Sequence, residues 1–260
     1  MSFNSLKFVT EEQIATITFD RPDAANGLNI EMATELLEAA KLVSQDTSLK
    51  ALILTGEGRF FCAGGDVASM YEASERAGGA VRDIADPLHA ALEIFAAMDI
   101  PLICAVNGTA AGAGFSMAVA GDLVVASDKA KFTMAYSNIG LSPDGSSSYY
   151  LPRLVGLRRT QELMYTNRVL TAEEALEWGL INAFVPAEEV MTKANELAKG
   201  FAKGARESNA AIKMLLREQE NASLSGQLQL ESETIGKCAD SIDGKEGVAS
   251  FIEKRKPNFQ

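Results

Sequence analysis

The chain has 260 residues, 47% of them hydrophobic and 23% charged, an ordinary balance for a globular protein. This length lets one domain, with at most a small appendage, bury a substantial core. The formal net charge of −11 argues against a nucleic-acid partner, because such a surface needs clustered basic residues.

The cysteines and the hydropathy of the chain indicate its cellular compartment and whether it binds metal or a membrane. The three cysteines, Cys62, Cys104 and Cys238, lie far apart and form no paired metal-binding motif, which is typical of free thiols in a reducing compartment. No apolar run approaches the ~20 residues that a membrane span requires, and the first residues lack the pattern of a secretory signal. We therefore expect a cytoplasmic protein with no metal site and no membrane partner.

The first half of the chain alternates strand-like and helix-like segments. Short runs of apolar and β-branched residues predict strands at 14–19, 49–55, 101–106, 122–126 and 131–134. Apolar residues at helical spacing predict helices at 30–43 and 84–95. Residues 73–86 mix alanine, glycine and charge, and we expect a mobile loop there. The alternation favours an α/β core of sheet and helices.

Helical patterns dominate after residue 146. The predicted helices lie at 158–165, 171–178, 188–204, 206–221 and 227–240, with a brief extended stretch at 184–185. We therefore divide the chain into a core of residues 1–199 and a helical C-terminal region of residues 200–260.

Two glycine-rich stretches, residues 60–66 and 107–114, each follow a strand-like run and lead toward a segment that can be helical. The start of a helix leaves backbone N–H groups without partners, and glycine and alanine let a ligand approach them closely. Two such loops facing one pocket can form an oxyanion hole, in which two N–H groups hold one developing negative oxygen. The alternative is a pair of tight connections in an α/β protein, but the repetition after similar strands favours the oxyanion hole.

Six motifs together resemble the enoyl-CoA hydratase/isomerase (crotonase) superfamily along nearly the whole chain. They lie at residues 20–29, 61–66, 107–114, 130–132, 151–156 and 175–180. The resemblance implies a spiral of ββα units followed by a helical trimerisation region, and a homotrimer or a dimer of trimers. It also implies an acyl-CoA thioester as substrate, so that coenzyme A is part of the substrate and no separate cofactor is needed.

Carried over by position, the resemblance assigns the oxyanion hole to the backbone N–H groups of Gly65 and Ala113. The family usually has glycine at the Ala113 position, which is a mild departure because the donor is the backbone. The resemblance also places a set of residues around the bent coenzyme A, the last two on its adenine side: Ala63, Gly64, Asp66, Val67, Arg21 and Ala25.

Hydratases of this superfamily use two glutamates, at positions that here hold Ser116 and Tyr136. Serine is a poor base without an activating partner, and a tyrosine with an ordinary pKa of about 10 is poorly matched to neutral pH. Ordinary hydration is therefore disfavoured, and we expect Tyr136 to contact the substrate.

A carboxylate appears nearby, at Asp144 in a Pro-Asp-Gly sequence. The residues alone leave two interpretations open, a turn with a helix N-cap or a functional acid. The resemblance favours function, because isomerases of the phenylacetate-pathway ring-opening group, the closest in motif, carry Pro-Asp here. One aspartate suffices to remove a proton from one carbon of the acyl chain and return it to another. We therefore expect an enoyl-CoA isomerase with Asp144 as acid and base.

The single histidine, His89, is by itself more typical of a helix residue with one polar contact. The resemblance offers an alternative, since aryl-CoA dehalogenases of the superfamily carry a water-activating histidine here and an attacking aspartate at the Asp144 position. Their ring-polarising tryptophan corresponds to Tyr136, however, and an aromatic residue expected at Gly65 is missing. Isomerisation therefore ranks above dehalogenation, with hydration and non-catalytic acyl-CoA binding as the remaining alternatives.

Overall fold

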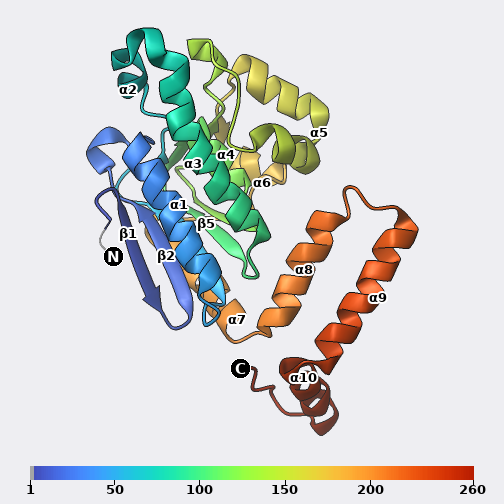
Figure 1. Ribbon diagram of the computed structural model, residues 1–260. Coiled ribbons are helices and arrows are strands. Elements are labelled where there is room, and N and C mark those ends of the chain that lie inside the picture. Colours follow the sequence, from blue (N-terminus) through green and yellow to red (C-terminus); the bar gives the residue numbers. More distant parts are fainter. Residues whose placement is uncertain (1–2) are drawn as a thin grey trace.

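The computed structural model describes residues 3–260, and its centre is a six-stranded sheet (Figure 1). Its strands, in spatial order, are β1 (Leu6–Glu11), β2 (Ile14–Phe19), β3 (Ala51–Gly56), β5 (Leu102–Val106), β7 (Leu123–Ser127) and β10 (Ala183–Val185). β1 and β2 form an antiparallel pair, and each neighbouring pair from β2 to β10 is parallel. The apolar runs of β3 and β5 fit this arrangement, because parallel strands are buried on both faces.

A smaller four-stranded sheet is built from β4 (Phe60–Cys62), β6 (Thr109–Ala111), β8 (Lys131–Thr133) and β9 (Leu170–Thr171). The first three strands are parallel, whereas β9 is antiparallel to β8. Three times along the chain, a strand of the larger sheet is followed by one of the smaller sheet and then by helical structure. This repeat confirms the predicted spiral of ββα units. Because β4 and β6 are parallel neighbours, the glycine loops that follow them emerge at the same edge.

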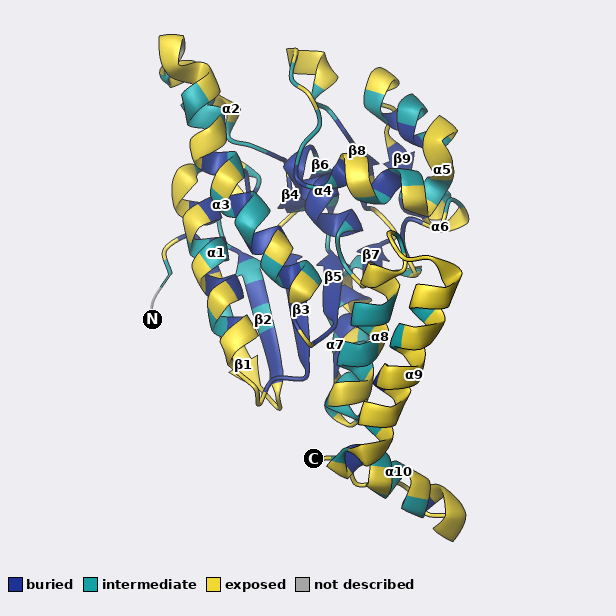
Figure 2. Cartoon of the chain, turned by 45° about the vertical axis from the view of Figure 1, so that its right-hand side comes forward, coloured by how far each residue is buried: buried dark blue, intermediate teal, exposed yellow. Residues whose placement is uncertain are grey.

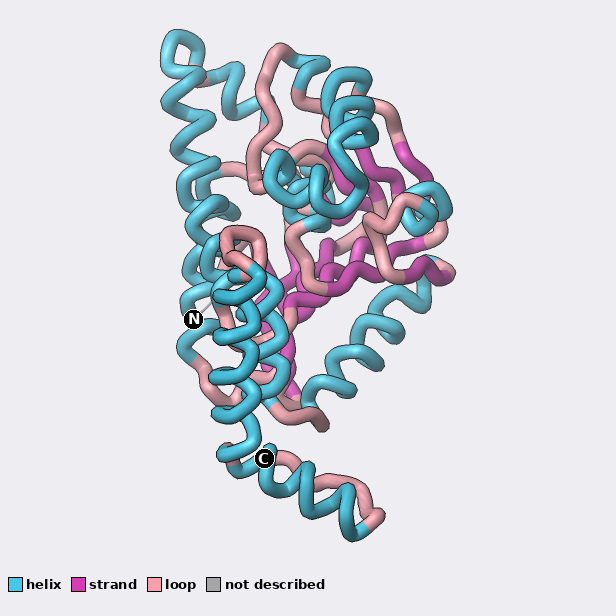
Figure 3. Tube along the Cα trace, turned by 90° about the vertical axis from the view of Figure 1, so that its right-hand side faces the viewer, coloured by secondary structure: helices cyan, strands magenta, loops and turns pink. Residues whose placement is uncertain are grey.

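Helices cover both faces of the central part of the larger sheet, where β3 and β5 are almost wholly buried (Figures 2 and 3). α1 (Ile30–Gln45) and α3 (Ala77–Ala97) pack together over the face that carries Leu52 and Leu54. α7 (Val190–Ala202) covers the opposite face, which carries Ile53. Since side chains alternate between the two faces of a strand, neighbouring residues of β3 belong to separate hydrophobic clusters.

Four further helices complete the core: α2 (Val67–Glu72), α4 (Ala113–Val119), α5 (Ser147–Thr166) and α6 (Ala172–Glu177). α5 is interrupted at Gly156, whose φ of 78° lies outside the helical region. α6 begins with a capping box in which Thr171 and Glu174 satisfy each other's backbone N–H groups. Short 3-10 turns occupy Pro22–Ala24, Ser74–Arg76, Ser137–Ile139 and Ala187–Glu189.

The expected loop at residues 73–86 is wrong, because most of this segment is helical. α3 begins at Ala77, directly after a 3-10 turn. Two glycines near its start lower the intrinsic helix propensity. The buried side chain of Ile84 and an ion pair between Arg76 and Asp83, with N and O atoms 3.0 Å apart, accompany the helical conformation. Packing against the core therefore outweighs local propensity in this segment.

α8 (Arg206–Glu218), α9 (Leu224–Asp240) and α10 (Ile242–Glu253) form the C-terminal region, which confirms its predicted helical character; α10 was not predicted. Figure 1 shows these helices extending away from the sheet, and in Figure 2 their surfaces are largely exposed. α7 ends at Ala202, and the division of the chain near residue 200 stays a prediction. No helix within residues 3–260 has both the length and the apolar character needed to cross a bilayer.

Candidate active site

The two glycine loops meet at the edge where β4 and β6 end. Gly64 and Gly112 have φ values of 102° and 52°, in the left-handed region that favours glycine. A Cβ atom placed on Gly64 would lie 3.5 Å from the Cα of Gly112 and 3.6 Å from the nitrogen of Ala113. The loops are therefore in direct contact, as the oxyanion-hole interpretation requires.

Backbone hydrogen bonds hold each loop in place. In the first loop, Leu28 donates its N–H to the carbonyl of Gly64 and accepts from the N–H of Asp66, both at 2.8 Å. In the second loop, the N–H of Gly112 donates to the carbonyl of Thr133 at 3.0 Å. These bonds fix the peptide planes on either side of the two predicted donors.

The N–H groups of Gly65 and Ala113 donate to no other residue of the described range, 3–260. Ala113 is the first residue of α4, so its N–H belongs to the unsatisfied first turn of a helix. Gly114 allows this helix to rest directly on β4, because a Cβ there would lie only 2.0 Å from the carbonyl oxygen of Cys62. Gly65 and Ala113 line the same cavity, so their two N–H groups are available at one site.

This cavity has a volume of about 380 Å³. The glycine loops form one part of its wall, and α3 and the segment between β8 and α5 form another. Apolar side chains make up much of the remainder: Leu28, Val67, Met70, Val81, Ile84, Ala85, Leu88, Ile139 and Leu141. A mostly apolar wall with a few polar groups is typical of a small-molecule site.

Asp144 lines this cavity, and its carboxylate contacts side chains from two other parts of the chain. Its Oδ1 accepts a hydrogen bond from the Tyr136 hydroxyl at 2.6 Å, and its Oδ2 lies 3.3 Å from Nε2 of His89. The carboxylate does not cap α5, whose N-cap is Ser146. Only the backbone of Asp144 serves the turn, because its carbonyl accepts from the hydroxyl of Ser147 at 2.9 Å.

Ser116 and Tyr136, at the positions of the hydratase glutamates, both contact Asp144. The buried Ser116 hydroxyl donates to the backbone carbonyl of Asp144 at 2.8 Å and lies 3.2 Å from the Tyr136 hydroxyl. Burial, and next the charge of Asp144, raises the pKa of Tyr136 well above its ordinary value. Tyr136 is therefore protonated at neutral pH, where it donates to the carboxylate and does not act as a base.

His89 projects from α3 toward the same turn and makes two polar contacts rather than one. Besides lying near Asp144, its Nε2 accepts a hydrogen bond from the N–H of Gly145 at 3.2 Å. Gly145 has a φ of 59°, and a Cβ there would lie 2.9 Å from the Cβ of Ser116. Glycine at this position thus lets the turn fit between α3 and α4.

Three of the residues expected around coenzyme A line the cavity: Ala63, Gly64 and Val67. Arg21, Ala25 and Asp66 are outside its lining but adjoin the first loop. The guanidinium of Arg21 pairs with the carboxylate of Asp66 at 3.1 Å, and the carbonyl of Ala25 accepts the N–H of Ala63 at 3.1 Å. The three residues that line the cavity and the three that lie outside it therefore meet around residues 63–66.

Cys62 precedes the first loop and is completely buried. Burial raises the pKa of its thiol to about 12, and its sulfur accepts the N–H of Gly64 at 3.4 Å. A neutral buried thiol is a packing group rather than a nucleophile at neutral pH. Within residues 3–260, no three His, Cys, Asp or Glu side chains are grouped so that they could hold a metal ion.

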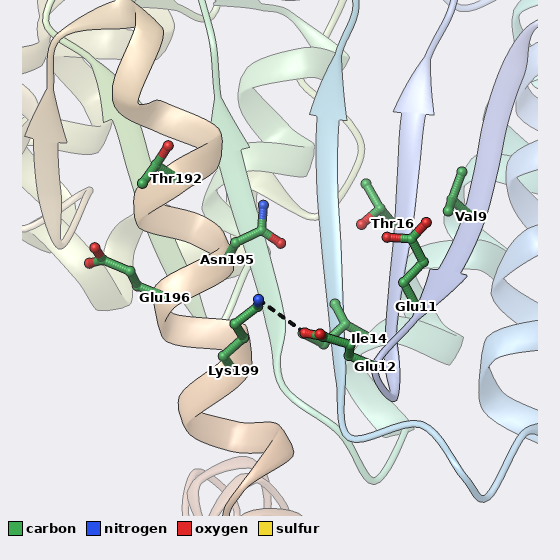
Figure 4. Close-up of a pocket in the computed structure, with 9 residues that line it drawn as sticks. All are labelled: Val9, Glu11, Glu12, Ile14, Thr16, Thr192, Asn195, Glu196 and Lys199. Carbon is green, nitrogen blue, oxygen red and sulfur yellow. Dashed lines mark ion pairs between the residues drawn. The ribbon is translucent and has the colours of Figure 1, made fainter.

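A larger groove, of about 800 Å³, lies between α7 and the outer face of β1 and β2 (Figure 4). An ion pair between Lys199 and Glu12, with N and O atoms 3.0 Å apart, crosses it. None of the predicted site residues lines this groove: its wall consists of Val9, Glu11, Glu12, Ile14, Thr16, Thr192, Asn195, Glu196 and Lys199. The predicted catalytic residues Gly65, Ala113 and Asp144 line the smaller cavity instead.

The apolar wall of the smaller cavity is the part of the site that the sequence reasoning missed. Ile84 and Leu88, spaced for one face of a helix, were used only to predict that helix. Met70 on α2 and Ile139 in a 3-10 turn carry no periodic signal, because each lies in a segment of only a few residues.

Comparisons with known proteins identify the family of the chain. The sequence profile of the family described as enoyl-CoA hydratase/isomerase matches residues 9–260. The 1,2-epoxyphenylacetyl-CoA isomerase of Escherichia coli (strain K12) is 38% identical over 253 residues, which cover 96% of this chain and 95% of that protein. The 4-chlorobenzoyl coenzyme A dehalogenase-2 of Arthrobacter sp is 36% identical, over 98% of this chain and 94% of that protein. An enoyl-CoA hydratase from Polaromonas sp. JS666 has a crystal structure that matches with a TM-score of 0.94 and 32% identity, covering 99% of this chain and 100% of that chain. The chain therefore belongs to the enoyl-CoA hydratase/isomerase family.

Proposed function

We propose that the protein is an enoyl-CoA isomerase that acts on a coenzyme A thioester without a separate cofactor. The observation that carries this assignment is the Asp144 carboxylate in one cavity with Gly65 and Ala113. Asp144 removes a proton from one carbon of the acyl chain, and the C–H electron pair moves into an enolate. The two N–H groups stabilise the enolate oxygen. Asp144 then returns the proton to another carbon, which shifts a double bond or rearranges a ring-derived acyl group.

The neighbours of Asp144 favour isomerisation over hydration. Hydration needs one group to activate water and another to protonate carbon. Ser116 and Tyr136 are not carboxylates, and both donate hydrogen bonds to Asp144. Asp86, the other acidic residue in the cavity wall, is exposed and makes no hydrogen bond with this cluster in the described part of the chain. Isomerisation needs only one carboxylate, because the group that removes a proton from the substrate also returns a proton to it.

The segment around the first glycine loop is the proposed coenzyme A site. Ala63, Gly64 and Val67 border the cavity, and Asp66 begins α2 as its N-cap. The Arg21–Asp66 ion pair joins this loop to the segment that contains Ala25, which the resemblance places on the adenine side. In this proposal the coenzyme binds along the loop, and its thioester carbonyl reaches Gly65 and Ala113.

A screen of 3-enoyl, dienoyl and ring-derived thioesters tests the assignment. We expect the chain to isomerise at least one of them, and Asp144→Asn to lower the turnover by about 10³-fold, because a positioned acid or base contributes about 10²–10⁴-fold. Calorimetry should show nearly unchanged acyl-CoA binding. Asp86→Asn is the matched control, since it removes a carboxylate from the same cavity, and its turnover should stay within about threefold of the original. Full activity of Asp144→Asn would contradict the assignment.

A second candidate is hydrolytic removal of a halide from an aryl thioester. The 3.3 Å contact between His89 and Asp144 favours it, as does the likeness to the Arthrobacter dehalogenase. Chloride release from 4-chlorobenzoyl-CoA measures this activity directly. We expect no release, because Tyr136 stands in place of the ring-polarising tryptophan of the superfamily's dehalogenases, and Gly65 stands where they carry an aromatic residue.

We further propose that the C-terminal helices assemble the chain into a homotrimer or a dimer of trimers. α8 and α9 carry exposed apolar side chains, of which Ile212, Leu228 and Ile235 line one groove of about 490 Å³. An exposed apolar patch of this kind marks an interaction surface. Light scattering should give three or six times the mass of one chain, and a substitution of Leu228 and Ile235 by aspartate should reduce that mass; a monomeric unsubstituted protein would contradict the proposal.

A further inference from the structure

Two cavities lie one after the other along one face of α3. The proposed acyl cavity, of about 380 Å³, is lined by Ala85 and His89, and a second cavity, of about 260 Å³, is lined by His89, Leu92 and Ala96. These residues are three or four positions apart, so they share one side of the helix. Within the described range, 3–260, His89 is the one residue that lines both cavities, and its side chain therefore forms the boundary between them.

Two polar contacts hold the imidazole of His89 in this position. Its Nε2 lies 3.3 Å from Oδ2 of Asp144 and accepts the N–H of Gly145 at 3.2 Å. Both partners belong to the turn before α5, so the side chain reaches from α3 to that turn. A ring that is fixed at both ends of its side chain does not swing aside freely, and it closes the acyl cavity at this point.

The second cavity has both the room and the surface for carbon atoms. Its volume of about 260 Å³ is several times the roughly 30 Å³ that one water molecule takes up in the liquid. Leu92, Ala96 and two tyrosine rings supply apolar groups to its wall, and Glu93 and Ser146 supply polar groups. From His89 to Ala96 the helix advances by about 10 Å. A hydrocarbon segment of several carbons therefore fits there.

The place of Asp144 brings an acyl chain to this boundary. In the proposed function Asp144 moves a proton of the acyl chain, so the reacting carbon lies against its carboxylate. Oδ1 of that carboxylate accepts the hydroxyl of Tyr136 at 2.6 Å, and Oδ2 faces the imidazole of His89. The carbons that follow the reacting one therefore meet the imidazole.

We propose that His89 is a specificity-determining residue that limits the length of the acyl group. Acyl chains that end at the imidazole fill the acyl cavity, and the same ring keeps longer chains out of the second cavity. A small residue at position 89 joins the two cavities, so that additional methylene groups become buried beside Leu92 and Ala96. This inference rests on the proposed binding of an acyl-CoA in the cavity of Asp144, and it adds a limit on the acyl group.

Calorimetry with saturated acyl-CoA thioesters, from butanoyl to decanoyl, tests the inference. These ligands carry no double bond to shift, so binding is measured without turnover. In the unsubstituted full-length chain we expect Kd to fall by about fourfold for each added methylene until the acyl group reaches His89, and then to stay level. In His89→Ala the fall should continue over at least two more methylenes, so that the longest thioesters bind at least about tenfold more tightly than to the unsubstituted chain.

Ala96→Leu is the matched control, because it fills the second cavity and lies outside the lining of the acyl cavity. By itself it should leave every Kd within about threefold of the original, since no acyl group reaches it while His89 is in place. Combined with His89→Ala, it should remove most of the gain for the longest thioesters. His89→Ser, a second small residue, should give the same gain as His89→Ala, and circular dichroism checks that each variant folds.

A folded small-residue variant at position 89 whose Kd levels off at the original acyl length would overturn the inference. A gain that survives in the double variant with Ala96→Leu would also overturn it. If no thioester binds to the unsubstituted chain, the proposed function fails and takes the inference with it. If thioesters bind with the expected length dependence but none of the unsaturated ones is isomerised, the assignment of the reaction fails and the length limit is kept.

Discussion

On one side of the acyl cavity the polar groups come from the backbone of the loops after β4 and β6, and on the other from the side chains of Tyr136, Asp144 and His89. The backbone side depends on close packing, as Gly114 shows with a Cβ position 2.0 Å from the carbonyl of Cys62. The other side depends on which side chains the sequence places at positions 89, 116, 136 and 144. In the proposed function, the first side holds the thioester and the second side determines which reaction follows.

After the loss expected for Asp144→Asn, the next largest effect is expected on the backbone side, at Ala113. Proline at this position removes the N–H, and a proline is tolerated at the first residue of a helix. We expect Ala113→Pro to lower kcat by about 10²–10³-fold, the typical effect of losing one oxyanion-hole donor. Stopped-flow or steady-state kinetics on the best thioester of the screen gives the measurement.

Ala113→Gly is the matched control, because it keeps the backbone N–H and removes only a methyl group. Its kcat should stay within about threefold of the original value. An equal loss in both variants would show that the methyl group, and not the N–H, matters at this position. It would contradict the claim that this side of the cavity acts through its backbone.

A smaller effect is expected on the side-chain side at Tyr136. Tyr136→Phe keeps the ring but removes the hydroxyl that donates to Oδ1 of Asp144 at 2.6 Å. We expect kcat to fall by about tenfold with little change in KM, because one hydrogen bond to a charged group is worth about 1.5–3 kcal/mol and part of it is replaced by water. A rise in KM with unchanged kcat would instead assign Tyr136 to binding alone.

The smallest expected effect concerns Cys62, which is buried beneath the first loop, and the free energy of unfolding at alkaline pH. Burial raises the pKa of the Cys62 thiol from 9.0 to about 12. The folded state thus keeps a proton that the unfolded chain loses, so this contribution to stability is present below pH 9 and lost as the pH rises toward 12. Between pH 8 and 10 the free energy of unfolding should fall by about 1 kcal/mol more in the original chain than in Cys62→Ala. Urea denaturation at the two pH values measures this difference, and identical pH dependence in the two proteins would contradict it.

Much of the backbone side could be predicted from the sequence, because its signals are local. The strands before the loops are apolar runs, and the glycines mark positions such as Gly64 and Gly112 where φ is positive. Segments with weak local signals were less predictable. The start of α3 contains two glycines, which lower its helix propensity. β1 is exposed along most of its length, so it lacks the hydrophobic pattern that predicts a buried strand.

The side-chain side could be predicted only in part. The identities of Ser116, Tyr136 and Asp144 were readable, together with the absence of the two glutamates. Their mutual hydrogen bonds were not, because the residues belong to α4, the segment after β8 and the turn before α5, which only the tertiary fold brings together. The position of His89 beside Asp144 required the same information, since the two lie on different elements 55 residues apart.

The most direct test of the isomerase assignment compares two reactions of the unsubstituted chain under one set of conditions. One is the conversion of a 3-enoyl-CoA to its 2-enoyl isomer, and the other is the hydration of that 2-enoyl-CoA. With one carboxylate in the cluster, we expect kcat/KM for isomerisation to exceed that for hydration by about 100-fold or more, the contribution of a missing second acid–base group. Hydration that is as fast as isomerisation, or faster, would contradict the account.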